Sequence, residues 1–250
     1  MPRPSHTIVV MMENHSYSDI IGNQGAPYLN KLAAKGALFT RSFAVTHPSE
    51  PNYLALFSGS THGVNSDVCP LNFHGRNLAS ELRAKHDTFV GYSESLPSVG
   101  FTGCSSGSYA RKHNPWSDFS RLPRSINKPF SRFPKRFGSL PDVSFVVPNL
   151  QHDMHDGTIS QADQWAHRHL AKYIRGARRH HGLVVITWDE DDYSQSNQIP
   201  TIVVGQDVTP GRYHHRIDHY GVLRTLEAVY HLHPLGQSAH RTPVANIWKH

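Results

Sequence analysis

The chain has 250 residues, 38% of them hydrophobic, which is enough to bury one substantial core and favours one domain over two. No apolar stretch is long enough to be an integral membrane segment, and no signal peptide precedes the first predicted strand. The formal charge is +6 with histidine neutral, and 20 histidines make it rise steeply in mild acid, which suits an anionic substrate.

Apolar runs alternate with helical patterns along the chain, and this alternation predicts βαβ units. We predict strands over residues 7–12, 37–45, 88–92, 143–147, 183–188 and 201–204. We predict helices over residues 27–35, 52–58, 78–85, 161–178 and 220–230. The longest helix is amphipathic, because its apolar residues recur at helical spacing. We therefore expect a single α/β domain over residues 1–250.

Residues 93–142 break this rhythm. They are rich in Gly, Pro and Ser, and they carry a run of basic residues between Arg121 and Arg136. A structureless loop of this length is unusual unless it is functional, so we predict a loop-rich excursion over the active-site face.

Cys69 and Cys104 are the two cysteines of the chain, and both lie in loop-like segments. A disulfide between them would stabilise the fold by roughly 3 kcal/mol. It would also indicate an oxidising compartment, so that the protein would be exported or periplasmic. The alternative is two unrelated thiols; we favour the disulfide.

Oxygen-rich side chains follow two of the predicted strands. Glu13 and Asn14 come directly after strand 7–12, and the acidic run 189–192 comes directly after strand 183–188. Ligands of open α/β sheets bind at the carboxyl ends of the strands. These two strand ends therefore suggest a divalent metal site, with Asp189 and Glu190 as the ligands from the acidic run. The alternative for that run is a solvated surface loop.

Ser49 precedes the predicted helix 52–58, where free backbone amides and the positive end of the helix dipole lie. The simplest interpretation is a helix cap. A serine oxygen bound to a divalent cation can instead become a nucleophile, and Asn52 could then stabilise a phosphoryl oxygen.

Three further segments carry histidines that can act in such a site. Residues 149–157 follow strand 143–147 and include Asp153 and His155, which could bind metal or phosphate or could form a polar turn. His113 lies within the excursion, and His219 precedes the last helix. Either of these two histidines, taken alone, is more often a surface residue.

Taken in order, six short segments resemble the bacterial phosphoesterase family, which groups acid phosphatases with phospholipase C enzymes. The segments are residues 13–16, 47–53, 112–115, 149–156, 188–190 and 219–220. The family belongs to the alkaline-phosphatase-like superfamily. The resemblance implies a doubly wound, mostly parallel α/β sheet with helices on both faces and a metal at the strand ends.

The resemblance also implies a role for each matched residue. Ser49 would be the nucleophile, and one histidine would protonate the leaving group. The implied metal ligands are Glu13, Asn14, Ser49, Asp189 and Glu190. The implied phosphoryl-binding residues are Asn52, His113, Asp153, His155 and His219. The chain departs from the acid phosphatases at Glu190, where they carry an aspartate, and it lacks the C-terminal extensions of the phospholipases, which favours a smaller soluble phosphate ester.

We therefore predict a metal-dependent phosphoric ester hydrolase that forms a phosphoseryl intermediate. Oxygen ligands favour Mg²⁺, Ca²⁺ or Mn²⁺, with Zn²⁺ or iron as alternatives. A phospholipase C-like or other phosphodiesterase is the alternative activity. In a two-metal variant, Asp153, His155 and His219 would hold a second ion about 4 Å from the first.

A sulfatase is disfavoured because the chain has no Cys-x-Pro-x-Arg segment. The alternative outside enzymology is a basic module that binds nucleic acid or acidic surfaces through the run between Arg121 and Arg136. That run lacks the aromatics on strands expected of a single-strand binder, so we expect it to steer phosphate esters instead. Nucleic acid is then expected only as a substrate, and the sequence makes no prediction of oligomeric state.

Overall fold

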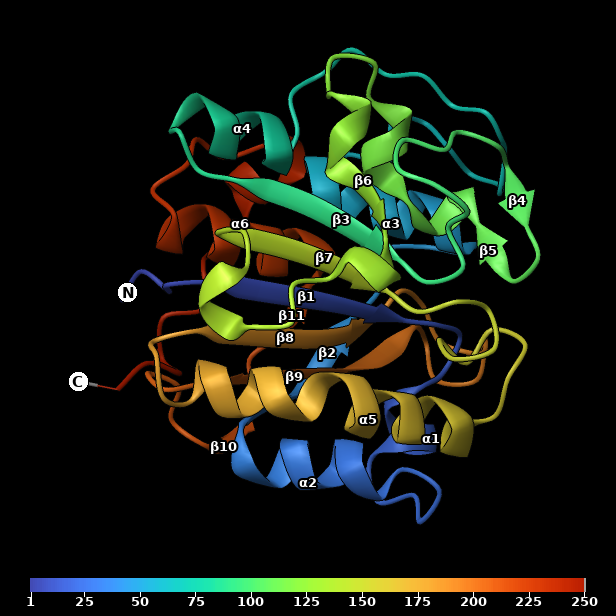
Figure 1. The fold of residues 1–250 in the computed structure, drawn as a ribbon. Coiled ribbons are helices and arrows are strands. Elements are labelled where there is room, and N and C mark those ends of the chain that lie inside the picture. Colours follow the sequence, from blue (N-terminus) through green and yellow to red (C-terminus); the bar gives the residue numbers. More distant parts are fainter. Residues whose placement is uncertain (250) are drawn as a thin grey trace.

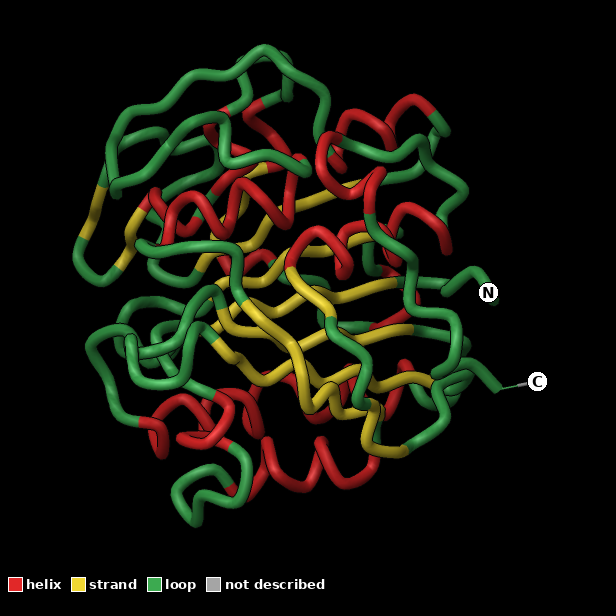
Figure 2. The backbone as a smooth tube through the Cα atoms, turned by 180° about the vertical axis from the view of Figure 1, so that it is seen from behind, coloured by secondary structure: helices red, strands yellow, loops and turns green. Residues whose placement is uncertain are grey.

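The computed structural model describes residues 1–249 and is built around a nine-stranded sheet (Figures 1 and 2). Its order is β10-β2-β9-β8-β1-β7-β3-β6, with β11 paired to β2. The strands are β1 (Thr7–Met12), β2 (Ala37–Phe43), β3 (Phe89–Ser93), β6 (Asn127–Pro129), β7 (Val143–Val147), β8 (Leu183–Trp188), β9 (Gln198–Gly205), β10 (Gly211–Tyr213) and β11 (Ile217–Asp218). β9 runs antiparallel to β8 and β2, whereas the other pairs of this sheet are parallel.

Helices cover both faces of the sheet (Figure 1). One face carries α3 (Ser49–Ser58), α4 (Leu78–Ala84) and α6 (His219–Val229), and the other carries α1 (Tyr17–Ile20), α2 (Pro27–Lys35) and α5 (Ile159–Ala177). β1 supplies both cores, because Val9 and Met11 pack towards α3 and α6 while Ile8 and Val10 pack towards α2 and α5. The predicted doubly wound, mostly parallel fold is confirmed.

The excursion over residues 93–142 contains more regular structure than the sequence predicts. It forms the hairpin β4 (Ser105–Ser106) and β5 (Tyr109–Ala110), and its β6 extends the main sheet by pairing with β3. Short 3₁₀ helices fill the rest, namely η1 (Arg111–His113), η2 (Pro115–Asp118), η3 (Arg124–Ile126), η4 (Phe130–Arg132) and η5 (Phe137–Ser139). A further one, η6 (Gly236–His240), follows α6. The predicted disulfide is present between Cys69 and Cys104 and ties the excursion to the segment after α3.

The predicted elements match the structure best in the centre of the sheet. β1, β7, β8 and α2 have the predicted bounds. The helix predicted over residues 52–58 instead begins at Ser49, because prolines are tolerated in a first helical turn whose N–H groups have no intrahelical partner. None of the helices within residues 1–249 has the length and apolarity that crossing a bilayer requires.

Candidate active site

The candidate site lies at the carboxyl ends of β1, β8 and β7. Met12 pairs with Trp188 in the sheet, so the next residues, Glu13 and Asp189, leave neighbouring strands side by side. The Asn14 backbone N–H donates to Asp189 Oδ1 at 3.1 Å, and the Glu13 N–H donates to the Asp153 carbonyl at 2.8 Å. Backbone hydrogen bonds thus join the three strand ends, and the acidic groups converge on one place.

Ser49 is the first residue of α3, and its side chain does not cap the helix. Pro48 occupies the cap position. The Ser49 hydroxyl points instead at two carboxylates, Glu13 Oε2 at 3.0 Å and Glu190 Oε1 at 3.3 Å, and the residue is 2% exposed. Helix capping therefore does not explain the position of Ser49. Its hydroxyl oxygen is not used by the helix backbone and is available to act as a nucleophile.

Asn52 is occupied by the turn that precedes Ser49. Its Oδ1 accepts from the backbone N–H groups of Val45 and Thr46, and its Nδ2 donates to the carbonyls of Thr46 and Pro48. These four bonds use the full hydrogen-bonding capacity of the amide. Asn52 thus holds the turn, and contact with a phosphoryl oxygen would require one of these bonds to be exchanged.

His113 reaches the site from η1 in the excursion. Its Nε2 lies 3.3 Å from Glu13 Oε1, and its Nδ1 lies 3.4 Å from Asp153 Oδ2. The imidazole stacks on Tyr53, with centroids 5.0 Å apart, and the Tyr53 hydroxyl donates to Glu13. Complete burial lowers the pKa of His113 to about 3, so the ring is neutral at ordinary pH.

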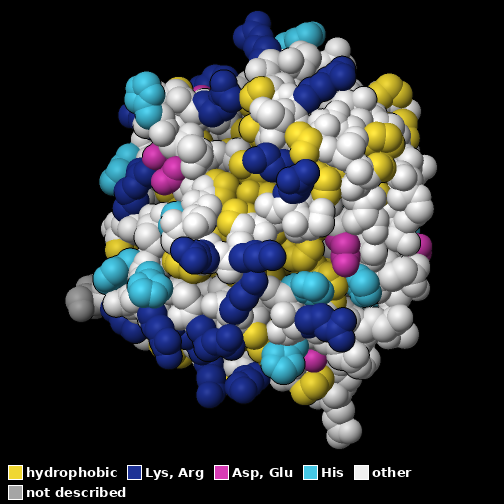
Figure 3. Space-filling view, viewed as in Figure 1, with side chains coloured by type: hydrophobic (Ala, Val, Ile, Leu, Met, Phe, Trp, Pro, Cys, Tyr) yellow, Lys and Arg dark blue, Asp and Glu magenta, His cyan; other side chains and the backbone are white. Residues whose placement is uncertain are grey.

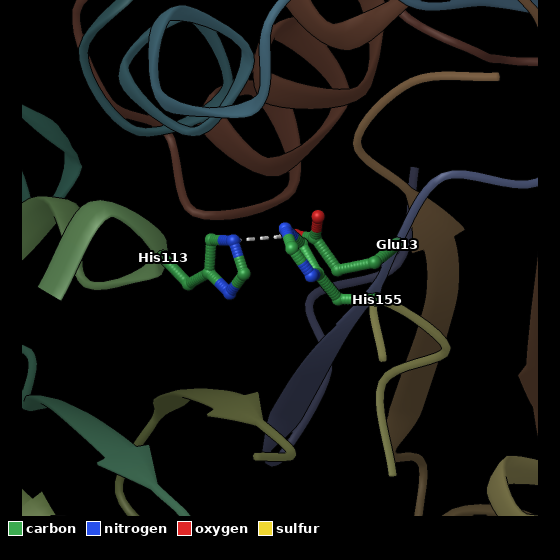
Figure 4. Close-up of side chains that lie close together, drawn as sticks. All are labelled: Glu13, His113 and His155. Atoms are coloured by element: carbon green, nitrogen blue, oxygen red, sulfur yellow. Dashed lines mark ion pairs between the residues drawn. The ribbon is translucent and has the colours of Figure 1, made fainter. Parts of the chain in front are cut away.

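His155 lies at the outer side of the site and is half-buried. Its ring points towards Glu13 and His113 (Figure 4). Its Nε2 lies 3.1 Å from Lys112 Nζ, and its Nδ1 lies 2.7 Å from Asp156 Oδ1. Asp153 is fully buried and contacts both histidines. Its Oδ1 accepts from the His155 backbone N–H, and its Oδ2 lies 3.4 Å from His113 Nδ1.

Lys112 and Asp67 extend the site beyond the histidines. Lys112 Nζ donates to Asp67 Oδ2 at 2.7 Å, and Asp67 Oδ1 accepts from the Glu50 N–H in the first turn of α3. Sequence reasoning missed Asp67. The available signal was its place two residues before Cys69, in the segment that the disulfide ties to the excursion.

His219 contacts the backbone of the site. Its Nε2 lies 2.6 Å from the Asp189 carbonyl oxygen, and its Nδ1 is buried with no hydrogen-bond partner within residues 1–249. Burial lowers its pKa. His219 therefore contacts the backbone directly after the end of β8.

His47 is a second residue that sequence reasoning did not single out. Its Nδ1 lies 2.7 Å from Glu190 Oε2, and its Nε2 lies 3.2 Å from Asp191 Oδ1. Tyr193, an exposed residue, stacks on its ring at 3.8 Å. Asp191 accepts hydrogen bonds from backbone N–H groups of the 193–197 loop and so holds that loop in place. Asp189 and Glu190 contact Asn14 and Ser49 instead.

The site holds more buried negative charge than its cations balance. Glu13, Asp153, Asp189 and Glu190 are each at most 4% exposed. Burial, and then the charges of Asp189 and Asp153, raise the pKa of Glu13 well above its usual value. Burial raises the pKa of Glu190 and of Asp153 to about 8. Asp189 Oδ2 and Asp153 Oδ2 are buried without a hydrogen-bond partner within residues 1–249. A bound cation would offset the charge of the buried carboxylates and would give the two unpartnered carboxylate oxygens something to bind. This donor set therefore fits a metal ion.

Two overlapping sets of side chains can hold that ion. The first is Glu13 and Glu190, whose hard oxygens face the Ser49 hydroxyl, together with Asp189 at the strand end next to Glu13. Glu13, His113 and His155 form a second set, with ligand atoms all within 4.8 Å of one another. The second set differs from the expected one of Asp153, His155 and His219, because His219 is turned to the Asp189 carbonyl.

Solved structures with this fold include hydrolases of several kinds. The chain superposes on a 2-O glycosaminoglycan sulfatase, BT1596, with a TM-score of 0.66 at 10% identity, covering 97% of this chain and 73% of that one. It superposes on an alkaline phosphatase superfamily protein from Vibrio parahaemolyticus with a TM-score of 0.63 at 13% identity, covering 98% and 71%. At these identities the likeness concerns the fold alone.

Proteins similar in sequence indicate which class of hydrolase this chain resembles. The chain is 50% identical over 251 residues to a phosphatidylinositol-3-phosphatase of Mycobacterium tuberculosis, covering 99% of this chain and 84% of that protein. It is 33% identical over 230 residues to a phosphate-repressible acid phosphatase of Penicillium chrysogenum, covering 84% of this chain and 55% of that one. The chain thus spans little more than half the length of this fungal relative.

The phosphoesterase family model matches residues 23–233, and the chain belongs to this family. Phosphoric ester hydrolysis is the chemistry of the class, so the prediction of a phosphoric ester hydrolase is confirmed.

Proposed function

We propose that the protein is a metal-dependent phosphatase that transfers the phosphoryl group to Ser49 before water releases it. The observation that carries this proposal is the Ser49 hydroxyl, buried at the start of α3 and held between Glu13 and Glu190. Structural serines at a helix start bond the helix backbone. Ser49 does not, and it faces the carboxylates at the strand ends.

Glu13, Asn14, Asp189 and Glu190 would hold the cation next to Ser49. A divalent cation bound there lowers the pKa of the serine hydroxyl and offsets charge on the phosphoryl group. The Ser49 proton already has carboxylate acceptors on two sides. The oxygen then attacks phosphorus, and the ester bond to the leaving group breaks as the bond to Ser49 forms.

His155 is our candidate for the proton donor to the leaving group. It is half-buried, whereas burial keeps His113 neutral. Asp156 Oδ1, 2.7 Å from His155 Nδ1, orients the imidazole. His113, stacked on Tyr53 and flanked by Glu13 and Asp153, serves to position the site.

We propose a phosphate monoester as the substrate. The relatives described above are named as phosphatases, and the mycobacterial one is named for a phosphorylated inositol lipid. Phospholipase C-like diester hydrolysis is the second candidate from the sequence, but the relatives do not favour it. A lipid-linked inositol phosphate is therefore the first natural substrate to test, alongside soluble monoesters.

Ser49→Ala should lower turnover of p-nitrophenyl phosphate by several orders of magnitude and abolish phosphate labelling of the acid-quenched enzyme. Ser58→Ala on the same helix is the matched control, because Ser58 is also buried but donates to the Leu54 carbonyl. The assay is run after chelation and with Mg²⁺, Ca²⁺, Mn²⁺, Zn²⁺ or Fe²⁺ restored singly, on mono- and diesters. Near-normal activity of Ser49→Ala, or full activity of the chelated enzyme, would contradict the mechanism.

A further inference from the structure

The exposed side of α5 carries a row of cations. Arg168, Lys172 and Arg175 recur at intervals of four and three residues, which places them along one stripe of the helix, and the exposed Arg179 extends this stripe just beyond the end of the helix. The one acidic residue of α5 is Asp163, which is buried and accepts the backbone N–H groups of Tyr28 and Leu29. The stripe therefore presents unbalanced positive charge.

A second set of cations continues this surface. Residues 119–141 contain no Asp or Glu, and Lys128, Arg132, Lys135 and Arg136 lie at least partly exposed there. This segment packs against α5 through Phe133 and Tyr173, with ring centroids 4.7 Å apart. We call the eight cations of the α5 stripe and of residues 128–136 the basic face. Figure 3 shows dark-blue side chains gathered over the centre and lower left of this view, with few magenta ones among them.

The basic face has no carboxylate partner within residues 1–249. None of its eight cations forms an ion pair there. Like charges three or four residues apart on a helix are destabilising. Such an arrangement lowers the stability of α5 and produces a strong field outside the molecule. An anionic partner would offset the repulsion.

The breadth of the basic face and the packing of its aromatic residues favour a membrane surface over a nucleic acid. α5 begins after the 149–157 loop that carries His155 and runs towards the amino-terminal end of β8, so Arg168 is the residue of the stripe nearest the candidate site. Its aromatic rings pack on one another, as Phe130 does on Phe133 and Trp165, and so are not free as stacking platforms for bases. The cations spread over a helix and the neighbouring segment, which suits a broad anionic plane.

We propose that the basic face docks the protein onto bilayers that contain anionic lipids. The proposal rests on the proposed function only in that such a surface would carry phosphate monoesters of the class the enzyme hydrolyses. Lys and Arg near an anionic leaflet attract it over about one Debye length, so docking must weaken as salt rises.

The test measures sedimentation with vesicles of phosphatidylcholine, with and without phosphatidylserine. Ser49→Ala is used as the parent protein so that no lipid is turned over. Two double variants, Lys172→Gln/Arg175→Gln and Lys135→Gln/Arg136→Gln, should each weaken binding to anionic vesicles about thirtyfold. Arg83→Gln/Lys85→Gln is the matched control, because these exposed residues lie at the end of α4 on the other face of the sheet. It should bind like the parent.

Lys172→Gln/Arg175→Gln, made in the active enzyme, should leave hydrolysis of soluble p-nitrophenyl phosphate unchanged. Equal binding to neutral vesicles, equal loss in the α4 control, or tighter binding to duplex DNA than to vesicles at equal phosphate would overturn the docking proposal. An enzyme without phosphatase activity whose vesicle binding still depends on the basic face would overturn the proposed function alone.

Discussion

At the scale of single residues, the site is defined by a surplus of carboxylates around one serine. Glu13 and Glu190 face the Ser49 hydroxyl, and the nearest lysine, Lys112, reaches the site only through His155 and Asp67. Even a divalent cation does not cancel four carboxylates, so a phosphate dianion needs a further positive group to enter. Lys112 is placed to supply it.

Lys112→Gln should raise the KM for p-nitrophenyl phosphate about ten- to a hundredfold, since a hydrogen bond to a charged group contributes roughly 1.5–3 kcal/mol. The turnover number should change less. Lys112→Arg should restore most of the affinity because it keeps the charge. Steady-state kinetics with Lys85→Gln as the control decides, and an unchanged KM in Lys112→Gln would show that the lysine only secures Asp67.

At the scale of elements, buried polar side chains join helices to other segments of the chain. Glu227 on α6 is the clearest example, because its buried carboxylate accepts from the Ser238 hydroxyl and from the Leu235 N–H. Burial raises its pKa to about 7, although these hydrogen bonds act in the opposite direction. The carboxyl that joins α6 to the C-terminal segment therefore titrates near neutrality.

The stability of the protein should fall as pH rises from about 4.5 to about 7 through Glu227. In this window the folded protein keeps the Glu227 proton and the unfolded chain has lost it, so the slope of unfolding free energy against pH is negative. Urea unfolding at several pH values should show a flatter slope in Glu227→Gln. In the control Glu81→Gln the slope should persist, since the Arg76 hydrogen bond lowers the pKa of Glu81 below this window. Identical slopes in wild type and Glu227→Gln would refute the assignment.

At the scale of the whole molecule, one disulfide bond and one ion pair connect the excursion to the segment after α3. The disulfide between Cys69 and Cys104 joins positions 35 residues apart, and the Lys112–Asp67 ion pair lies close to it in sequence. The excursion delivers His113 to the site through η1. Stability and catalysis therefore share this connection.

Cys69→Ser/Cys104→Ser should lower the free energy of unfolding by about 3–4 kcal/mol, as expected for a closed loop of this length. It should also raise the KM, because Asp67 and Lys112 lose their common tether. Denaturant unfolding and steady-state kinetics, with and without a reductant, measure both effects. A normal KM combined with the expected loss of stability would show that the excursion keeps its place without the disulfide.

The sequence by itself determined the central layer of this protein. β1, β7 and β8 have the predicted bounds, because strands buried on both faces read as uninterrupted apolar runs. The convergence of Glu13 and Asp189 followed from the rule that parallel strands end at the same edge of a sheet. The disulfide was likewise predicted from the two cysteines, and the phosphoesterase class from the resemblance of six short segments to that family.

Tertiary structure alone decided how the side chains are paired. The short strands β6, β10 and β11 carry no readable pattern in two or three residues. Three contacts illustrate this: His47 with Glu190, Lys112 with Asp67, and Asn52 with the backbone of the turn before Ser49. No local periodicity specifies the partners in these contacts. Periodicity reports which face of an element is buried, whereas the partner of a polar side chain depends on where the whole chain brings distant segments together.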